Sequence, residues 1–132
     1  EWDSWIKFRN FFKEIKFKLV PGNHDILPEK AYQDANIELL DETFESEPFT
    51  FVHENDEKNF KDGLFISGHV HPAIRMRGSG RQGMTLACFY LGEKNIILPA
   101  FSGFTGGFKI RPKKGEKVLP LSPKGLFLVE NQ

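Results

Sequence analysis

Phe17-Lys18-Leu19-Val20-Pro21-Gly22-Asn23-His24-Asp25 is the stretch of sequence that most strongly constrains the fold. Its first four residues predict a short strand and Pro21-Gly22 ends it, so Asn23, His24 and Asp25 fall in a loop at the strand's carboxyl end. Open α/β sheets bind their ligands at that edge. Gly, Asn and Asp are also turn formers, so an ordinary β-turn is the alternative explanation of this loop.

A second loop occupies the same position relative to a strand. Residues 63–67 form a compact apolar run that predicts a strand, and Gly68-His69-Val70-His71 follows it directly. Neutral imidazole is a ligand for zinc, manganese, iron or nickel, and two histidines on a turning loop can point toward neighbouring metals. The alternative is a pair of exposed or hydrogen-bonded histidines in a loop rich in Gly and Pro.

The remaining histidine, His53, closes the apolar run 49–52, which also predicts a strand. All four histidines of the chain therefore follow predicted strands. Surface histidines scattered without a function would also be expected in the predicted helix or in the long carboxyl-terminal region. Their confinement to strand ends favours a shared site.

The other elements predict an α/β fold that is mainly β in its carboxyl-terminal half. Apolar residues at helical spacing predict an amphipathic helix over 2–14, and a short helix is expected over 28–35. Further strands are expected at 37–40, 73–77, 83–91, 95–98, 106–110 and 125–129, with turns at 112–115 and 121–125. No internal repeat or interdomain linker is visible, so residues 1–132 are interpreted as one domain.

Composition narrows the class of protein. Eighteen basic residues balance eighteen acidic ones, which gives no global attraction to nucleic acid or an anionic membrane. The single cysteine, Cys88, lies in a strand-like run and is expected to be a buried, inert thiol. No membrane span or signal peptide is visible, so we expect a cytoplasmic protein without membrane partners. Most of the fourteen Phe are expected in the core.

The order strand, Gly-Asn-His-Asp, isolated His and Gly-His-x-His resembles the second half of the calcineurin-like metallophosphoesterase signature. The resemblance implies a β-sandwich flanked by helices and a hydrolase with two divalent metal ions, manganese being favoured. It implies that Asn23, His53 and His69 bind one metal and that His71 binds the other. It further implies that His24 is the general acid and that Asp25 orients it.

The same resemblance also shows which motifs of the family this sequence lacks. The family also has an Asp-x-His motif and a bridging Asp near its amino terminus, and neither is present here. Asp3 is better explained as a residue that caps a helix. The expectation is an N-terminally incomplete domain that lacks the first βαβ part. Three imidazoles and one amide carry no negative charge, so this chain alone should bind metal weakly and turn over slowly. A non-catalytic binding module with the same fold is the alternative.

Residues 68–75 and 98–107 resemble one bacterial branch of that family, the ligase-associated DNA damage response endonucleases of the PdeM type. This resemblance implies DNA as the substrate, a role in DNA repair, and association with a DNA ligase and helicase. Arg75, Arg77 and Arg81 form a local basic cluster that suits phosphate. Basic residues also discourage pairing at a hairpin edge, which is the alternative.

Overall fold

The computed structural model describes residues 2–54, 63–78, 82–101 and 105–130. Arg81 lies outside these residues. Contacts divide the chain into two compact units, Glu1–Phe44 and Glu45–Gln132, and each is considered by itself. The interpretation of residues 1–132 as one incomplete domain stays a prediction.

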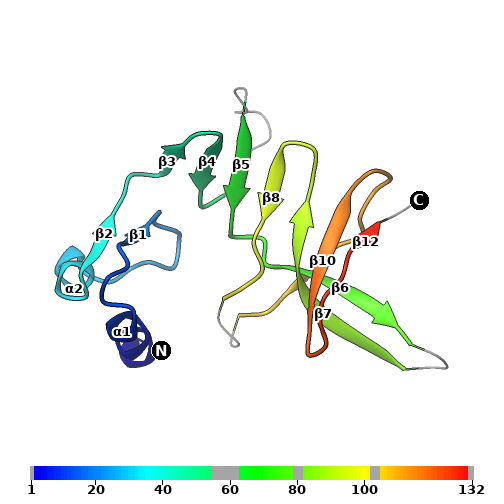
Figure 1. Ribbon diagram of the computed structural model, residues 1–132, viewed down its shortest axis with the longest axis horizontal. Helices are drawn as coiled ribbons and strands as arrows, with labels where there is room; N and C mark the ends of the chain where they lie inside the picture. Colours follow the sequence, from blue (N-terminus) through cyan, green and yellow to red (C-terminus); the bar gives the residue numbers. More distant parts are fainter. Residues whose placement is uncertain (1, 55–62, 79–81, 102–104, 131–132) are drawn as a thin grey trace. The chain divides into compact units, whose positions relative to one another are not determined.

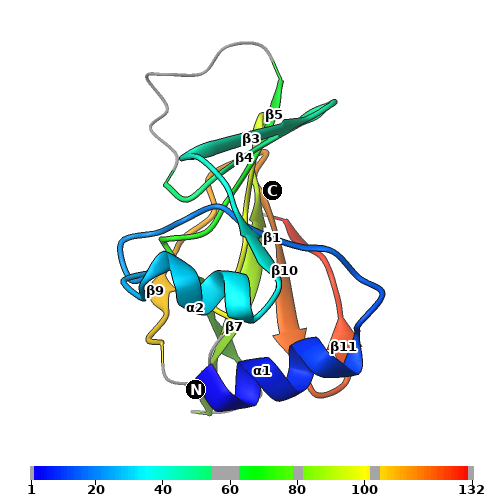
Figure 2. The same cartoon turned by 90° about the vertical axis from the view of Figure 1, so that its left-hand side faces the viewer.

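The first unit contains two helices and a small parallel sheet. Its elements are α1 (Trp2–Phe11), β1 (Phe17–Leu19), α2 (Glu29–Asp34) and β2 (Ile37–Leu39), and β1 pairs with β2 in parallel. The two helices run beside each other (Figure 2), and the Trp2 and Tyr32 rings meet edge to face at 5.7 Å between centroids. Tyr32, Ala35 and Ile37 form the buried core, against which the apolar side of α1 packs. This core fixes the strand that carries the first loop.

Helix α1 ends earlier than the sequence predicted. Its end is Phe11 and not residue 14, because the following turns are closed by tighter bonds: Phe12 N donates to Arg9 O and Ile15 N donates to Phe12 O, each at 3.1 Å. Helix α2 and strands β1 and β2 lie where the sequence predicted them, within two residues at each end.

The second unit is almost entirely β-structure. Its strands are β4 (Phe49–Val52), β5 (Leu64–Ser67), β6 (Pro72–Arg77), β7 (Gly83–Leu91), β8 (Asn95–Ile97), β9 (Phe108–Lys109), β10 (Lys117–Ser122), β11 (Gly125–Leu126) and β12 (Val129–Glu130). The main sheet has the order β11-β10-β7-β8-β5-β4-β3, where β3 (Thr43–Ser46) spans the boundary between the units. Strand β6 pairs with β7 and β9. A mixed α/β fold that is mainly β in its carboxyl-terminal half is confirmed.

Three neighbouring strands of this sheet are parallel and therefore end at one edge. Figure 1 shows β4, β5 and β8 side by side, with β4 and β8 both parallel to β5. The register pairs Val52 with Ser67 and Ser67 with Ile97. Because the last residues of the three strands are paired, the segments that follow them begin at the same edge of the sheet and enter the same region of the second unit.

The core of the second unit lies under one face of β6, β7 and β10. It contains Ile74, Cys88 and Val118, and Cys88 and Val118 are fully buried. Burial raises the pKa of the Cys88 thiol to about 11, which keeps it protonated and unreactive at neutral pH. The prediction of a buried, inert cysteine is therefore supported by its position.

Two strands were missed by the sequence prediction. Strand β10 was not predicted: no element was expected at residues 117–120, and a turn was expected from residue 121. Proline is normally unfavourable inside a sheet, because it has no N–H to donate. Pro120 pairs with Cys88 on one side, and on the other side it falls between the pairing of β12 at Lys117–Val118 and that of β11 at Leu121–Ser122. Strand β3, with one apolar residue among polar ones, lies between the strands expected at 37–40 and 49–52, where no strand was predicted.

The expectation that most Phe side chains are buried was also wrong. Phe65 is in the core, whereas several others are exposed by 39–87%: Phe8, Phe11, Phe101, Phe108 and Phe127. Small units cannot bury every large apolar side chain, because they have a high ratio of surface to volume. Within the described residues, no helix is long and apolar enough to cross a membrane.

Candidate metal centre

Two of the predicted ligands meet at the edge where the parallel strands end. His53 follows β4 and His69 follows β5, and the parallel pairing of these strands brings the two loops together. His53 Nε2 lies 3.0 Å from His69 Nδ1, and the rings are nearly perpendicular, with centroids 4.9 Å apart. Gly68 N donates to His53 O at 3.1 Å and ties the two loop backbones together. Two predicted site residues of the second unit are thus in direct contact.

Both histidines of the Gly68–His71 loop have left-handed backbone conformations. The φ angle is 55° at His69 and 51° at His71. For a residue other than glycine such a conformation costs on the order of 1–3 kcal/mol, and it persists only where the surrounding structure imposes it. Three tertiary hydrogen bonds hold this segment. Gly68 N donates to His53 O, Leu98 N donates to Ser67 O at 2.7 Å, and Phe108 N donates to His71 O at 2.9 Å.

Glu54 is a residue of this site that the sequence analysis did not identify. Its Oε1 lies 3.7 Å from His69 Nε2, so a carboxylate faces the ring nitrogen opposite the one that faces His53. Histidine ligands of metals commonly have such a carboxylate on their second nitrogen, where it fixes the tautomer and orients the ring. Its position next to His53 was the available sequence signal.

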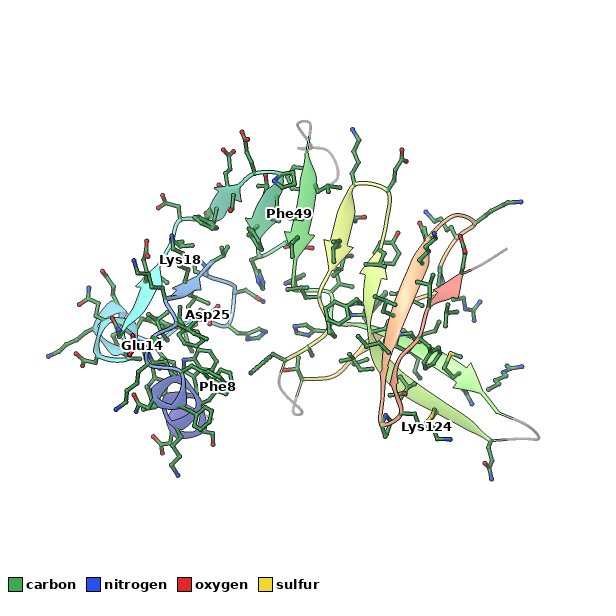
Figure 3. The ribbon with its side chains drawn as sticks, in the orientation of Figure 1. Phe8, Glu14, Lys18, Asp25, Phe49 and Lys124 are labelled. Atoms are coloured by element: carbon green, nitrogen blue, oxygen red, sulfur yellow. The ribbon has the colours of Figure 1, made fainter. Side chains whose placement is uncertain are left out.

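The loop Gly22–Asp25 of the first unit is closed by its own residues. Asp25 N donates to Gly22 O at 3.0 Å, and Gly22 N donates to Asp25 Oδ2 at 2.8 Å. Figure 3 shows Asp25 in this loop after β1. Asn23, His24 and Asp25 are exposed. The Asp25 carboxylate thus contributes to the turn itself, and its predicted action on His24 stays a prediction.

His71 lies at a cavity of about 330 Å³, at the lower end of the range for small-ligand sites. The lining residues come from the loop, from β6 and β7, and from the segments after β8 and before β9: His71, Ala73, Thr85, Ala87, Ala100, Phe101, Thr105 and Gly107. A Cβ at Gly107 would lie 2.8 Å from the Ala73 Cβ, so only glycine allows this approach. The cavity has a floor of small side chains.

Arg75 and Arg77 are exposed on β6 and lie on the cavity side of that strand. Side chains alternate along a strand, so residues 73, 75 and 77 share one face, and Ala73 lines the cavity. The register supports this, because Arg75 pairs with Thr85, another lining residue. A predicted third member of the cluster, Arg81, is not among the described residues.

The spacing of two predicted ligands suits a metal ion. Two nitrogens bound to one Zn²⁺ at about 2.0–2.1 Å with tetrahedral angles lie about 3.3 Å apart, close to the separation of His53 Nε2 and His69 Nδ1. Across the described ranges, however, no group of three or more His, Cys, Asp or Glu side chains is arranged to hold a metal ion. The second unit therefore brings together two of the predicted ligands, His53 and His69. Asn23 belongs to the other unit, and its role as a ligand stays a prediction.

A solved structure shares this fold. The crystal structure of Pseudomonas putida nuclease MPE matches with a TM-score of 0.72 and 33% sequence identity, over 87% of this chain and 55% of that chain. The chain resembles a nuclease. It spans about half the length of that protein. A scan against protein-family models found no match, and neither did a search of curated proteins.

Proposed function

We propose that this chain is part of a metal-dependent phosphodiesterase of the calcineurin-like metallophosphoesterase superfamily that hydrolyses nucleic acid. One observation carries the proposal: His53 Nε2 and His69 Nδ1 converge to 3.0 Å where two parallel strands end. Two further facts support it, namely the left-handed histidines of the Gly68–His71 loop and the similarity to a protein described as a nuclease.

In this proposal His53, His69 and Asn23 hold one divalent cation and His71 holds a second, with manganese favoured. When bound, the two cations would lower the pKa of a water molecule and balance the charge on the phosphoryl oxygens. His53 and His69 must present neutral nitrogens to bind a cation, and Glu54, 3.7 Å from His69 Nε2, would favour the tautomer of His69 that leaves Nδ1 for the cation.

The protein's own groups would handle the proton and the phosphate. His24 would donate a proton to the leaving oxygen, a step that general acids commonly accelerate by about 10²–10⁴. Arg75 and Arg77 would hold the phosphate groups of the substrate on the face of β6 that carries the cavity. DNA as the substrate, a cytoplasmic location, and association with a DNA ligase and helicase belong to this proposal through the sequence resemblance.

The test uses the full-length encoded protein. With Mn²⁺ it should hydrolyse DNA and a generic phosphodiester, EDTA should abolish both activities, and His53→Ala should lower the affinity for Mn²⁺ measured by electron paramagnetic resonance. The exposed residue Met84 supplies a control variant, Met84→Ala, which should leave the affinity unchanged. Metal-independent hydrolysis, or equal Mn²⁺ affinity in His53→Ala and the parent protein, would contradict the proposal.

A non-catalytic binding module is the second candidate function. It is favoured by the incomplete ligand set, because the described residues hold no group of three or more metal-binding His, Cys, Asp or Glu side chains. This candidate predicts nucleic-acid binding that is insensitive to EDTA and no hydrolysis by the full-length protein. The assay with Mn²⁺ separates the two functions directly.

A further inference from the structure

The ring of Phe101 is the most exposed large apolar side chain of the described residues, with 87% of its surface accessible. Exposed Phe residues occur singly on many proteins and need no explanation by themselves. Phe101 differs because it lines the cavity that also contains His71. It follows β8 at the edge where β4 and β5 also end, which is the edge that carries His53 and His69.

Three other lining residues leave room for a flat ligand. Ala73 and Ala87 are paired across β6 and β7 and both line the cavity, so they present a small apolar floor. Gly107 packs against this floor without a side chain. A planar ring can lie on such a surface, whereas branched side chains would fill the space.

Positive charge continues from the cavity along the same strand. Arg75 follows Ala73 by two residues, roughly 7 Å along β6, and Arg77 follows by a further two. His71, the predicted metal ligand, lies at the other end of this row. The face therefore combines an aromatic ring, an apolar floor and two cations that suit phosphate.

We propose that the cavity lined by Phe101, Ala73 and Ala87 binds one nucleobase of the substrate by stacking on Phe101, with the adjoining phosphates on Arg75 and Arg77. This inference rests on the proposed function and makes Phe101 a positioning residue: it would fix the strand so that a phosphodiester lies at His71. A second copy of the chain, or another segment of the protein, covering Phe101 is the competing occupant.

Binding is measured first, without turnover, by fluorescence anisotropy of a labelled oligothymidylate with the full-length protein in EDTA. The matched probe is the same strand with abasic sites in place of the bases. Stacking of one base on an aromatic ring raises the binding affinity between about fivefold and about a hundredfold. Phe101→Ala should weaken binding of the oligothymidylate by that factor and leave binding of the abasic strand unchanged. Phe101→Trp should restore it.

Controls separate stacking from folding and charge. Phe11→Ala removes another exposed ring, 82% accessible, from the first unit and should have no effect on either probe. Arg75→Ala should weaken both probes equally and reduce the slope of log K against log salt by about 0.7, as expected for one phosphate contact on a single strand.

The inference is overturned by equal losses on the two probes in Phe101→Ala, by unchanged binding in that variant, or by a parent protein that binds neither probe. A subsequent hydrolysis assay with Mn²⁺ keeps the two proposals distinguishable. Base-dependent binding without any hydrolysis supports the nucleobase site and contradicts the proposed function. Hydrolysis that does not depend on Phe101 or on the bases supports the function and overturns the nucleobase site.

Discussion

The loops Gly22–Asp25 and Gly68–His71 both follow a strand of a parallel pair, yet they are built differently. The first closes on itself through two bonds between Gly22 and Asp25, and its side chains are exposed. The second has two left-handed histidines and is held by partners that directly follow β4 and β8 and by a partner in β9.

Because of this difference, the two motifs are not equally strong indications of a functional site. A turn that satisfies its own hydrogen bonds would form with or without a function, so the structure of the first loop gives little support for a site beyond the sequence motif. Placing two non-glycine residues at positive φ costs free energy, and tertiary contacts hold the loop in this conformation despite that cost. The Gly68–His71 loop is therefore the stronger indication of a site, and the Gly22–Asp25 loop depends more on the sequence resemblance.

A substitution of His69 is the strongest test of the difference between the two loops. Replacement of His69 by glycine removes the imidazole but keeps the left-handed backbone accessible, so any loss cannot be attributed to a misfolded turn. We expect kcat/KM for Mn²⁺-dependent hydrolysis by the full-length protein to fall about a thousandfold, because several kcal/mol of charge stabilisation is lost.

Steady-state kinetics with a generic diester measures this effect, and Met84→Ala provides the control for an exposed substitution. Activity of His69→Gly within a factor of ten of the parent protein would show that the unusual backbone of this loop does not serve catalysis.

The first loop is tested at His24. A general acid matters when the leaving group is a poor one, so His24→Gln should slow hydrolysis of DNA about a hundredfold and that of a p-nitrophenyl diester by much less. Both rates are compared in one protein preparation with saturating Mn²⁺. Equal effects on the two substrates would remove the proton-donating role and leave Gly22–Asp25 as an ordinary turn.

The sequence predicted those parts of the molecule that depend on local patterns. Apolar runs located β4 and β5, and the residues after them located the loops that carry His53, His69 and His71. The same rules missed β10. There Pro120 falls between the pairing of β12 and that of β11 on one side, which accommodates a residue without an N–H, and strand pairing is not a local property.

The geometry of the site was not accessible from the sequence for a similar reason. The contact between His53 and His69 requires the register of β4 on β5, and the approach of Glu54 to His69 follows from that register. The cavity depends on Gly107, whose missing side chain only has meaning next to Ala73. Each of these contacts joins residues that are distant in the chain.

Glu54 provides a further test of the second loop, because its carboxylate lies near His69. Glu54→Gln keeps the shape of the side chain and removes the charge that faces His69 Nε2. We expect Mn²⁺ affinity to fall by about 10–100-fold, as for other residues that orient histidine ligands. Glu45→Gln, at another exposed position, is the matched control and should not change the affinity. An unchanged affinity in Glu54→Gln would assign the 3.7 Å contact to surface charge alone.

The smallest effects concern stability and have opposite signs in the two loops. His71→Gly relieves a positive φ at the cost of some backbone entropy, so the free energy of unfolding should rise by about 1 kcal/mol. Asp25→Ala removes the bond to Gly22 N and should lower it by about 1 kcal/mol. Urea unfolding of the full-length protein in EDTA measures both changes. A loss of stability in His71→Gly would mean that the left-handed histidine is held by favourable packing, and the argument that its conformation is retained for chemistry would fail.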